Sequence, residues 1–214
     1  MRSNRFGPIK RLDSLDPSVI SLERRSDRQE KVASDLLSVG IENFTFTAAV
    51  DGQLEYGWLG ALAGKRGCAE SHSLLLESSL SLQMPLLVLE DDIVFHCTRT
   101  ELLSVINAFL GDPSLDVLCL HYESDRTWEV SDLLSVGFAV VSTAAYVVKP
   151  RAIQTLIRDF RRSARELENH RNFPIDHAWW HSQGTSLLFA LPTKKVSFQA
   201  MGYSDITRCD VPAK

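Results

Sequence analysis

Three consecutive carboxylates follow a run of apolar residues in the middle of the sequence. Residues 85–89 read Pro-Leu-Leu-Val-Leu, and Glu90, Asp91 and Asp92 come directly after them. In an extended chain Glu90 and Asp92 point to one side and Asp91 points to the other. Two carboxylates on one side of a strand end supply the hard oxygen ligands that Mg²⁺ and Mn²⁺ prefer. The alternative is a solvated acidic turn, but the buried strand before the cluster and the apolar residues 93–95 after it favour a metal site.

A divalent ion at this cluster suits one class of reaction, the transfer of a sugar from a nucleotide diphosphate. The diphosphate leaving group gains negative charge as the sugar carbon departs, and a divalent ion that bridges its oxygens stabilises that charge as a Lewis acid. The reaction also needs a base that accepts the proton of the acceptor hydroxyl. The sequence must therefore supply such a base near the sugar carbon in addition to the acidic cluster.

Three arginines follow the first apolar run of the chain, which covers residues 18–22. Arg24, Arg25 and Arg28 stand within five residues of one another. Arginine pairs well with phosphate oxygens, so Arg25 and Arg28 are candidates for holding the diphosphate. The alternative is a charged first turn on an exposed helix face.

The four cysteines are scattered along the chain and form no C-x-x-C pair. A zinc knuckle or a redox motif is therefore not expected. In a reducing compartment the cysteines are free thiols, and no neighbouring base in the sequence marks one of them as a nucleophile. His177 and His181 are four residues apart and would share a helix face, but no third metal ligand accompanies them.

The elements that must position these residues alternate between strand and helix. Apolar runs predict strands at 18–22, 44–49, 85–89, 116–120 and 136–148, and near Leu187 and Val196. Helical periodicity and start signals predict helices at 26–39, 68–82, 98–111 and 150–168, and a short segment at 175–183. This order predicts an α/β sandwich with a mostly parallel central sheet, which binds its ligands beyond the carboxyl ends of the strands.

Local signals predict where several of these elements begin and end. Ser26 with Gln29, and Thr98 with Glu101, have the spacing of a capping box. Gly40 is placed to end the first helix in a left-handed turn. Residues 51–67 contain repeated glycines without a clear period, and residues 122–135 are polar and mixed, so we expect loops in both ranges. The whole chain, 1–214, is expected to form a single domain, with residues 1–17 as a loosely ordered segment.

Composition excludes some partners and gives an expectation for location. The formal net charge is −4, which argues against a nucleic-acid-binding protein. Neither a signal peptide nor an apolar stretch long enough to span a bilayer is visible, so we expect a cytoplasmic protein. The arginines of the predicted helix 150–168 leave open a weak contact with anionic lipid at the inner face of the membrane, although intervening acidic residues favour a solvated face.

Several segments resemble glycosyltransferase family 25, the family of lipooligosaccharide β-galactosyltransferases and procollagen galactosyltransferases. The similar segments occur in the order of the family and cover nearly the whole chain. One departure is Ser21, where the family usually has Asn. The segments are Val19–Arg28, Gly40–Ile41, Ala49–Gly52, Gly67–His72, Leu87–Asp92, Thr143–Val148, Pro174–Asp176, and Gln199 with Ser204–Ile206.

The resemblance implies a GT-A fold, which is Rossmann-like, a UDP-sugar donor and transfer with inversion at the anomeric carbon. It implies that Mn²⁺ or Mg²⁺ is bound by Glu90 and Asp92 and that galactose passes to a saccharide acceptor of a glycan or glycolipid, as in lipopolysaccharide biosynthesis. The residues that it implies at the donor are Arg25, Arg28, Asp51, Gly52, Ser71, His72, Glu90 and Asp91.

For some of these residues a purely structural role is an open alternative. Asp51 and Gly52 also read as a plain Asp-Gly turn. His72 is expected either to touch the diphosphate or to hold the acidic cluster.

The resemblance also points to a catalytic base late in the chain. Asp176 is the leading candidate, because it lies in the matching segment and precedes Trp179 and Trp180, which could stack on a sugar or belong to the core. Asp176 is equally well placed to cap a short helix. Asp205 is its main rival, and Glu123 and Asp125 are lesser ones.

Two other functions remain as alternatives. A nucleotidyltransferase would need a glycine-rich loop after the first strand, and residues 23–26 contain no glycine. A non-catalytic protein that binds nucleotide sugars is the other alternative, and the intact acidic cluster argues mildly against it.

Overall fold

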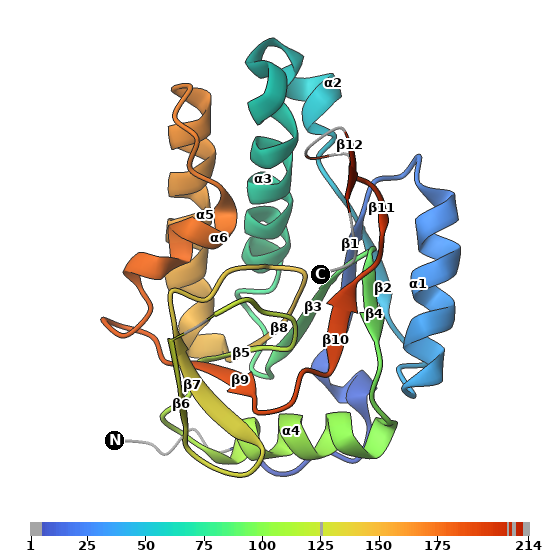
Figure 1. Cartoon of the computed structure of the whole chain (residues 1–214), viewed down its shortest axis with the longest axis vertical. Helices are drawn as coiled ribbons and strands as arrows, with labels where there is room; N and C mark the ends of the chain where they lie inside the picture. Colours follow the sequence, from blue (N-terminus) through green and yellow to red (C-terminus); the bar gives the residue numbers. More distant parts are fainter. Residues whose placement is uncertain (1–5, 125, 205, 207–208, 212–214) are drawn as a thin grey trace.

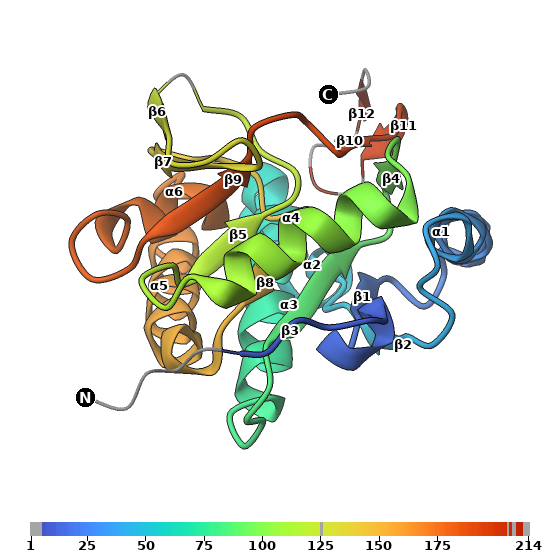
Figure 2. The same ribbon diagram turned by 90° about the horizontal axis from the view of Figure 1, so that it is seen from below.

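The computed structural model describes residues 6–124, 126–204, 206 and 209–211. An eight-stranded sheet forms its centre, and helices cover both faces of the sheet (Figures 1 and 2). The helices are η1 (Leu12–Leu15), α1 (Ser26–Ser38), α2 (Gly52–Tyr56), η2 (Gly57–Leu62), α3 (Ala63–Ser78), α4 (Arg99–Gly111), α5 (Pro150–Glu168), α6 (Ile175–Ala178) and η3 (Trp179–His181).

The strands of the central sheet are β1 (Ser18–Ser21), β2 (Thr45–Ala48), β3 (Leu86–Glu90), β5 (Val117–Cys119), β6 (Arg126–Glu129), β7 (Leu134–Phe138), β8 (Ala145–Val148) and β9 (Phe189–Pro192). Two small antiparallel sheets pair β4 (Ile93–Phe95) with β10 (Ser197–Gln199) and β11 (Gly202–Ser204) with β12 (Cys209–Val211).

The central sheet is mixed in its pairing, although most of its strands point the same way. Its order is β2-β1-β3-β8-β5-β9-β7-β6. The pairs β1–β2, β1–β3 and β5–β9 are parallel, whereas β8 and β7 are antiparallel to both of their neighbours. Six strands therefore run in one direction and two run against them. The expected mostly parallel sheet is correct for strand direction, but four of the seven pairings are antiparallel.

Alternation along the strands divides the core into two layers. Leu87 and Leu89 of β3 belong to a buried cluster with α1 and α4, whereas Leu86 and Val88 belong to a second cluster with α3 and α5. This is the period-two pattern of a strand that is buried on both faces. The result is a three-layer α/β/α arrangement, with α1 and α4 on one face of the sheet and α3 and α5 on the other (Figure 2).

The three predicted helix boundaries are confirmed, including the start of α1 at Ser26, but only one of the two predicted capping boxes forms. Thr98 and Glu101 form the expected capping box at the start of α4, and Gly40 has a φ of +79° after α1. The box predicted at Ser26 is wrong, because the N-cap of α1 is Arg25 and makes no capping hydrogen bond with its side chain. The Arg25 guanidinium instead pairs with Asp27 in the first turn.

The range 51–67, predicted as a loop, is mostly helical. It contains α2, η2 and the first turn of α3. The glycines that suggested a loop serve close packing, since a Cβ at Gly52 would lie 2.0 Å from the Ala63 carbonyl oxygen and one at Gly67 would lie 2.6 Å from the Val50 oxygen. Glycine is therefore required here for the close approach of α3 to the end of β2.

Three further ranges differ from expectation or add to it. Residues 122–135, expected to be a loop, contain β6, and the predicted strand 136–148 is divided between β7 and β8. Within the segment 1–17, which we expected to be loosely ordered, Leu12 and Leu15 of η1 are fully buried in the core.

Two features bear on a membrane contact: the length and apolarity of the helices, and the arginines of α5. No helix in the described part of the chain is both long and apolar enough to cross a bilayer. Three arginines of α5 have acidic neighbours: Arg151 pairs with Asp116, Arg158 with Asp159 and Arg161 with Glu77. A lipid contact of this helix stays a prediction.

Candidate active site

A cleft opens at the carboxyl ends of β1, β2 and β3, where the sequence predicted a ligand site. It encloses about 660 Å³, part of it open to solvent. The three strands are parallel neighbours, so their carboxyl ends lie at one edge of the sheet. The lining residues that bear on the chemistry are Ser21, Arg28, Asp51, Cys68, Ser71, His72, Glu90, Asp91 and Asp92.

Glu90, the last residue of β3, is held by side chains from α3 and from the segment that precedes β8. His72 Nε2 of α3 lies 3.2 Å from Glu90 Oε1, and the Thr143 hydroxyl donates to the same oxygen at 2.9 Å. Burial raises the pKa of Glu90, but the contacts with His72 and Thr143 outweigh it and leave the pKa below its ordinary value. Both contacts fall on Oε1, so Oε2 has no hydrogen bond to any residue in the described part of the chain.

Asp91 turns to the opposite side of the sheet and is occupied by protein groups. The Ser21 hydroxyl donates to Asp91 Oδ2 at 2.7 Å, and Arg28 of α1 donates to Oδ1 at 2.8 Å. Burial raises the pKa of Asp91, and the hydrogen bonds from Arg28 and Ser21 offset only part of that rise. Ser21 and Arg28 thus hold both oxygens of the middle carboxylate, which leaves it little capacity for a ligand.

Asp92 has the weakest contacts of the three carboxylates. Gln199 Nε2 lies 3.3 Å from its Oδ1, and Arg28 lies 3.7 Å from its Oδ2. Burial and the nearby charge of Glu90 raise the pKa of Asp92 to about 7. A partly buried carboxylate beside another one, whose nearest cationic group among the described residues is the Arg28 guanidinium at 3.7 Å, is an arrangement that a divalent cation would stabilise. Asp92 and Oε2 of Glu90 therefore fit a hard metal ion, whereas Asp91 does not.

Among the other residues predicted to contact the donor, Arg28 lies beside the three carboxylates, whereas Arg25 and Asp51 make structural contacts. Arg28 lines the cleft beside the carboxylates, whereas Arg25 lines a neighbouring hollow and pairs with Asp27. Asp51 caps α2 by accepting from the Gln53 amide.

Asp51 also pairs with Arg24 at 2.8 Å. Burial raises the pKa of Asp51, but the hydrogen bonds from Arg24 and the Gln53 amide outweigh burial and lower it.

Ser71 and Gly52 connect backbone segments at the wall of the cleft. The Ser71 hydroxyl donates to the Gly67 carbonyl and accepts from the Val50 amide, so it joins α3 to the end of β2. Gly52 permits the contact with Ala63. Both residues line the cleft, and each of them also has a packing role.

A second cleft adjoins the first and contains the proposed base. It spans about 1040 Å³, part of it open to solvent, and Cys68, Glu90 and Asp92 line both clefts. Asp176 lines the second cleft in the first turn of α6. The N-cap of α6 is Pro174, so the alternative in which Asp176 caps this helix is wrong. The Asp176 carboxylate accepts a long hydrogen bond of 3.4 Å from the Ser142 amide. Asp205 and Asp125 lie outside the described residues.

The two tryptophans that follow Asp176 have different environments. Trp179 is fully buried and packs against Tyr146, Phe160 and Phe189. Trp180 is 39% exposed and stacks on His177. Of the pair, only Trp180 can present a ring face to a sugar.

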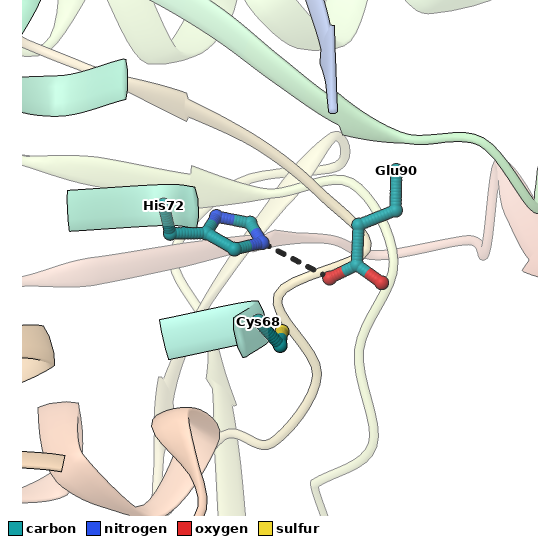
Figure 3. Close-up of side chains that lie close together, drawn as sticks. All are labelled: Cys68, His72 and Glu90. Carbon is teal, nitrogen blue, oxygen red and sulfur yellow. Dashed lines mark hydrogen bonds and ion pairs between the residues drawn. The ribbon is translucent and has the colours of Figure 1, made fainter. Parts of the chain in front are cut away.

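Cys68 and Tyr146 also lie at this site and were not among the residues predicted from the sequence. Cys68 stands one turn before His72 on α3 and faces Glu90 (Figure 3). The Tyr146 hydroxyl of β8 lies 3.1 Å from His72 Nδ1. The spacing of Cys68 and His72, four residues apart, was the available signal for a shared helix face.

The fold and the cleft define an α/β protein with an acidic site at the carboxyl edge of its sheet. A comparison with models of known protein families found no match to the chain, and neither did a comparison with curated proteins. The geometry of the site and the resemblance of its segments are therefore the basis for the function proposed below.

Proposed function

We propose that the protein is a metal-dependent, inverting glycosyltransferase that moves a sugar from a UDP-sugar to a saccharide acceptor. The sugar that the resemblance implies is galactose. The observation that carries the proposal is the meeting of two clefts at Glu90 and Asp92. A transferase needs adjoining spaces for donor and acceptor, with the charge-stabilising groups at their boundary. The mixed sheet flanked by helices is compatible with a GT-A-like fold, and it is equally compatible with other Rossmann-like folds.

In this proposal the first cleft holds the nucleotide diphosphate. Glu90 and Asp92 hold Mn²⁺ or Mg²⁺, which supplies Lewis-acid stabilisation of the departing diphosphate when bound. Arg28 adds a positive charge at the same place, and its contact with Asp91 fixes its position. His72 and Thr143 hold the Glu90 carboxylate by its other oxygen.

The second cleft holds the acceptor sugar. Asp176 accepts the proton of the attacking hydroxyl as the bond from that oxygen to the anomeric carbon forms and the bond to the UDP oxygen breaks. An inverting transfer is a single displacement, so this base acts on the side of the sugar opposite to the leaving UDP. The location of Asp176 in the second cleft, with Glu90 and Asp92 at its boundary, supports this role.

The experiment measures UDP binding and UDP release with the full chain. Mn²⁺ should raise the affinity for UDP at least tenfold in the parent, and the Asp92→Asn variant should lose this increase because the metal loses a charged ligand. The parent should release UDP from UDP-galactose in the presence of a saccharide acceptor. The Glu129→Gln variant, changed on the exposed strand β6, is the matched control and should behave like the parent.

Three outcomes distinguish the alternatives. Equal UDP affinity with and without metal in the parent would exclude the metal role. Metal-dependent binding without UDP release under any acceptor would indicate a non-catalytic nucleotide-sugar-binding protein. Release of pyrophosphate from a nucleoside triphosphate would indicate a nucleotidyltransferase.

A further inference from the structure

Cys68, His72 and Glu90 bring three different ligand types to one point. Their sulfur, nitrogen and carboxylate oxygen atoms all lie within 4.8 Å of one another. Cys68 and His72 are one turn apart on α3 and extend from the same helix face towards the end of β3, where Glu90 lies (Figure 3). In the part of the chain that the structure describes, this is the one cluster of its kind.

The distances suit a tetrahedral ion. Bonds of about 2.0–2.2 Å from zinc to nitrogen and oxygen place these two atoms roughly 3.3 Å apart at a tetrahedral angle. The distance between His72 Nε2 and Glu90 Oε1 is 3.2 Å. A thiolate at about 2.3 Å from the metal would lie roughly 3.6 Å from each of them. The Cys68 sulfur now lies within 4.8 Å of the other two ligand atoms. It would therefore have to approach them by at most little more than an ångström.

A partner for the far side of the histidine ring is already in place. Tyr146 is fully buried, and its hydroxyl lies 3.1 Å from His72 Nδ1. A histidine that binds a metal through Nε2 usually donates its Nδ1 hydrogen to an oxygen, which fixes the ring and its tautomer. The Tyr146 oxygen can accept that hydrogen, while in the metal-free protein the hydroxyl can instead donate to Nδ1.

We propose that Cys68, His72 and Glu90 form a binding site for Zn²⁺ or a similar thiophilic divalent ion. One thiolate and one carboxylate balance the two positive charges, and the mixed sulfur, nitrogen and oxygen ligands favour zinc over Mg²⁺ and Mn²⁺. Binding displaces the proton of the thiol into solvent. Cys68 and Glu90 line both clefts, so an ion can reach the site, and a water molecule can complete its coordination.

The site stands independently of the proposed transferase, but the two share Glu90. If Glu90 binds zinc through Oε1, the oxygen that now contacts His72, the orientation of its carboxylate relative to Asp92 changes. Zinc would then compete with Mn²⁺ for binding to the Glu90 carboxylate. The competition rests on the proposed function, whereas the binding of zinc itself does not.

Titration of the metal-free full chain with Co²⁺, a spectroscopic substitute for zinc, tests the site. A thiolate bound to Co²⁺ gives a charge-transfer band in the near ultraviolet. We expect the band to saturate at one equivalent and to disappear when Zn²⁺ is added. The Cys68→Ser variant should lose the band, whereas the Cys97→Ser/Cys209→Ser double variant should keep it in full. Absence of the band in the parent, or its persistence in Cys68→Ser, would overturn the proposal.

A second variant tests the histidine without changing a ligand. Tyr146→Phe keeps the buried ring and removes the hydroxyl next to His72 Nδ1. Loss of such an outer partner weakens metal affinity by about 10–100-fold, and we expect a decrease in that range. Unchanged affinity would contradict binding through His72. Thermal unfolding of each metal-free variant shows whether the fold is intact, and all these readouts are independent of UDP release.

Discussion

The alternation of side chains at the end of one strand separates the roles of neighbouring residues. Glu90 continues the face of Leu86 and Val88 towards α3, where His72 meets it, and Asp91 turns to α1, where Arg28 meets it. Two carboxylates adjacent in the sequence thus have different partners and pKa values shifted in opposite directions. The side to which each one points was predictable from the period of a strand.

The partners of these carboxylates were only partly predictable. His72 was expected near the acidic cluster, and Arg28 near the donor. Cys68 and Tyr146 come together with Glu90 only because α3 packs across β3 and β8. No local sequence pattern predicts that tertiary contact. The roles of Ser21 and Thr143 also depend on tertiary contacts with the strand end.

The first prediction at the scale of single residues concerns the base. Asp176→Asn preserves the size of the side chain and removes its basicity, so turnover should fall on the order of 10²-fold or more. UDP affinity and melting temperature should stay near those of the parent, because among the described residues the carboxylate accepts a single long hydrogen bond, from the Ser142 amide. Initial rates at saturating UDP-galactose, with calorimetric UDP binding, provide the measurement.

The matched control for this prediction lies in the same cleft. Glu123, a lesser candidate for the base, also lines the second cleft, and Glu123→Gln should keep most of the turnover because Asp176 is the base in this proposal. Near-normal transfer by Asp176→Asn would exclude this residue as the base, and Asp205 would be the next to test.

At the scale of elements, a buried lysine joins two helices on opposite faces of the sheet. Lys149 precedes α5 and is 1% exposed, and its Nζ donates to the carbonyls of Phe109 and Asp112 at the end of α4. Burial lowers the pKa of Lys149 to about 8, helped by the charge of Arg151 and opposed by Asp112 and Asp116. The lysine thus donates to carbonyl groups at the end of α4, where the Phe109 carbonyl also accepts from the Asp112 amide.

This shift predicts how stability changes with pH. The unfolded chain holds the lysine proton up to about pH 10.5 and the folded chain only up to about pH 8, so the unfolded state binds more protons between these values. The contribution of Lys149 to the free energy of unfolding should therefore rise with pH across this window. Urea unfolding of the parent and of Lys149→Met at pH 7.5 and 9.5 measures it. A stability difference between the two that is the same at both pH values would contradict the shift.

The elements themselves were largely predictable, with errors where packing overrides local pattern. Strands β1, β2, β3 and β5 and helices α1, α4 and α5 lie within a few residues of their predicted bounds. The error at 51–67 arose because glycines that usually mark loops here allow helices to approach a strand end closely. Strand β6 was missed because all four of its residues are exposed, which removes the alternation of apolar and polar residues.

At the scale of the whole molecule, the candidate site depends on residues from widely separated parts of the chain. Arg28 donates to the Tyr203 carbonyl at 2.7 Å, and the Ala200 amide donates to the Asp92 carbonyl at 2.8 Å. Strand β10, which precedes these late residues, pairs with β4 directly after the carboxylates. The wall of the cleft beside Asp92 is therefore complete only when early, middle and late segments have come together.

The strand order also has a consequence for the protein while a ribosome is making it. Strand β3 pairs with β8 on one side, and about 55 residues separate Glu90 from Ala145, so at about 5–20 residues per second their synthesis takes roughly 3–11 s. During that interval the nascent chain has an apolar strand with one unpaired edge, which is the kind of surface that chaperones bind and that aggregates. Ribosome-bound chains arrested with residues up to about 135 outside the exit tunnel should be cleaved rapidly by protease within β3, and chains with residues up to 204 outside should resist. Equal resistance of the two would mean that the first three strands are already protected before β8 is made.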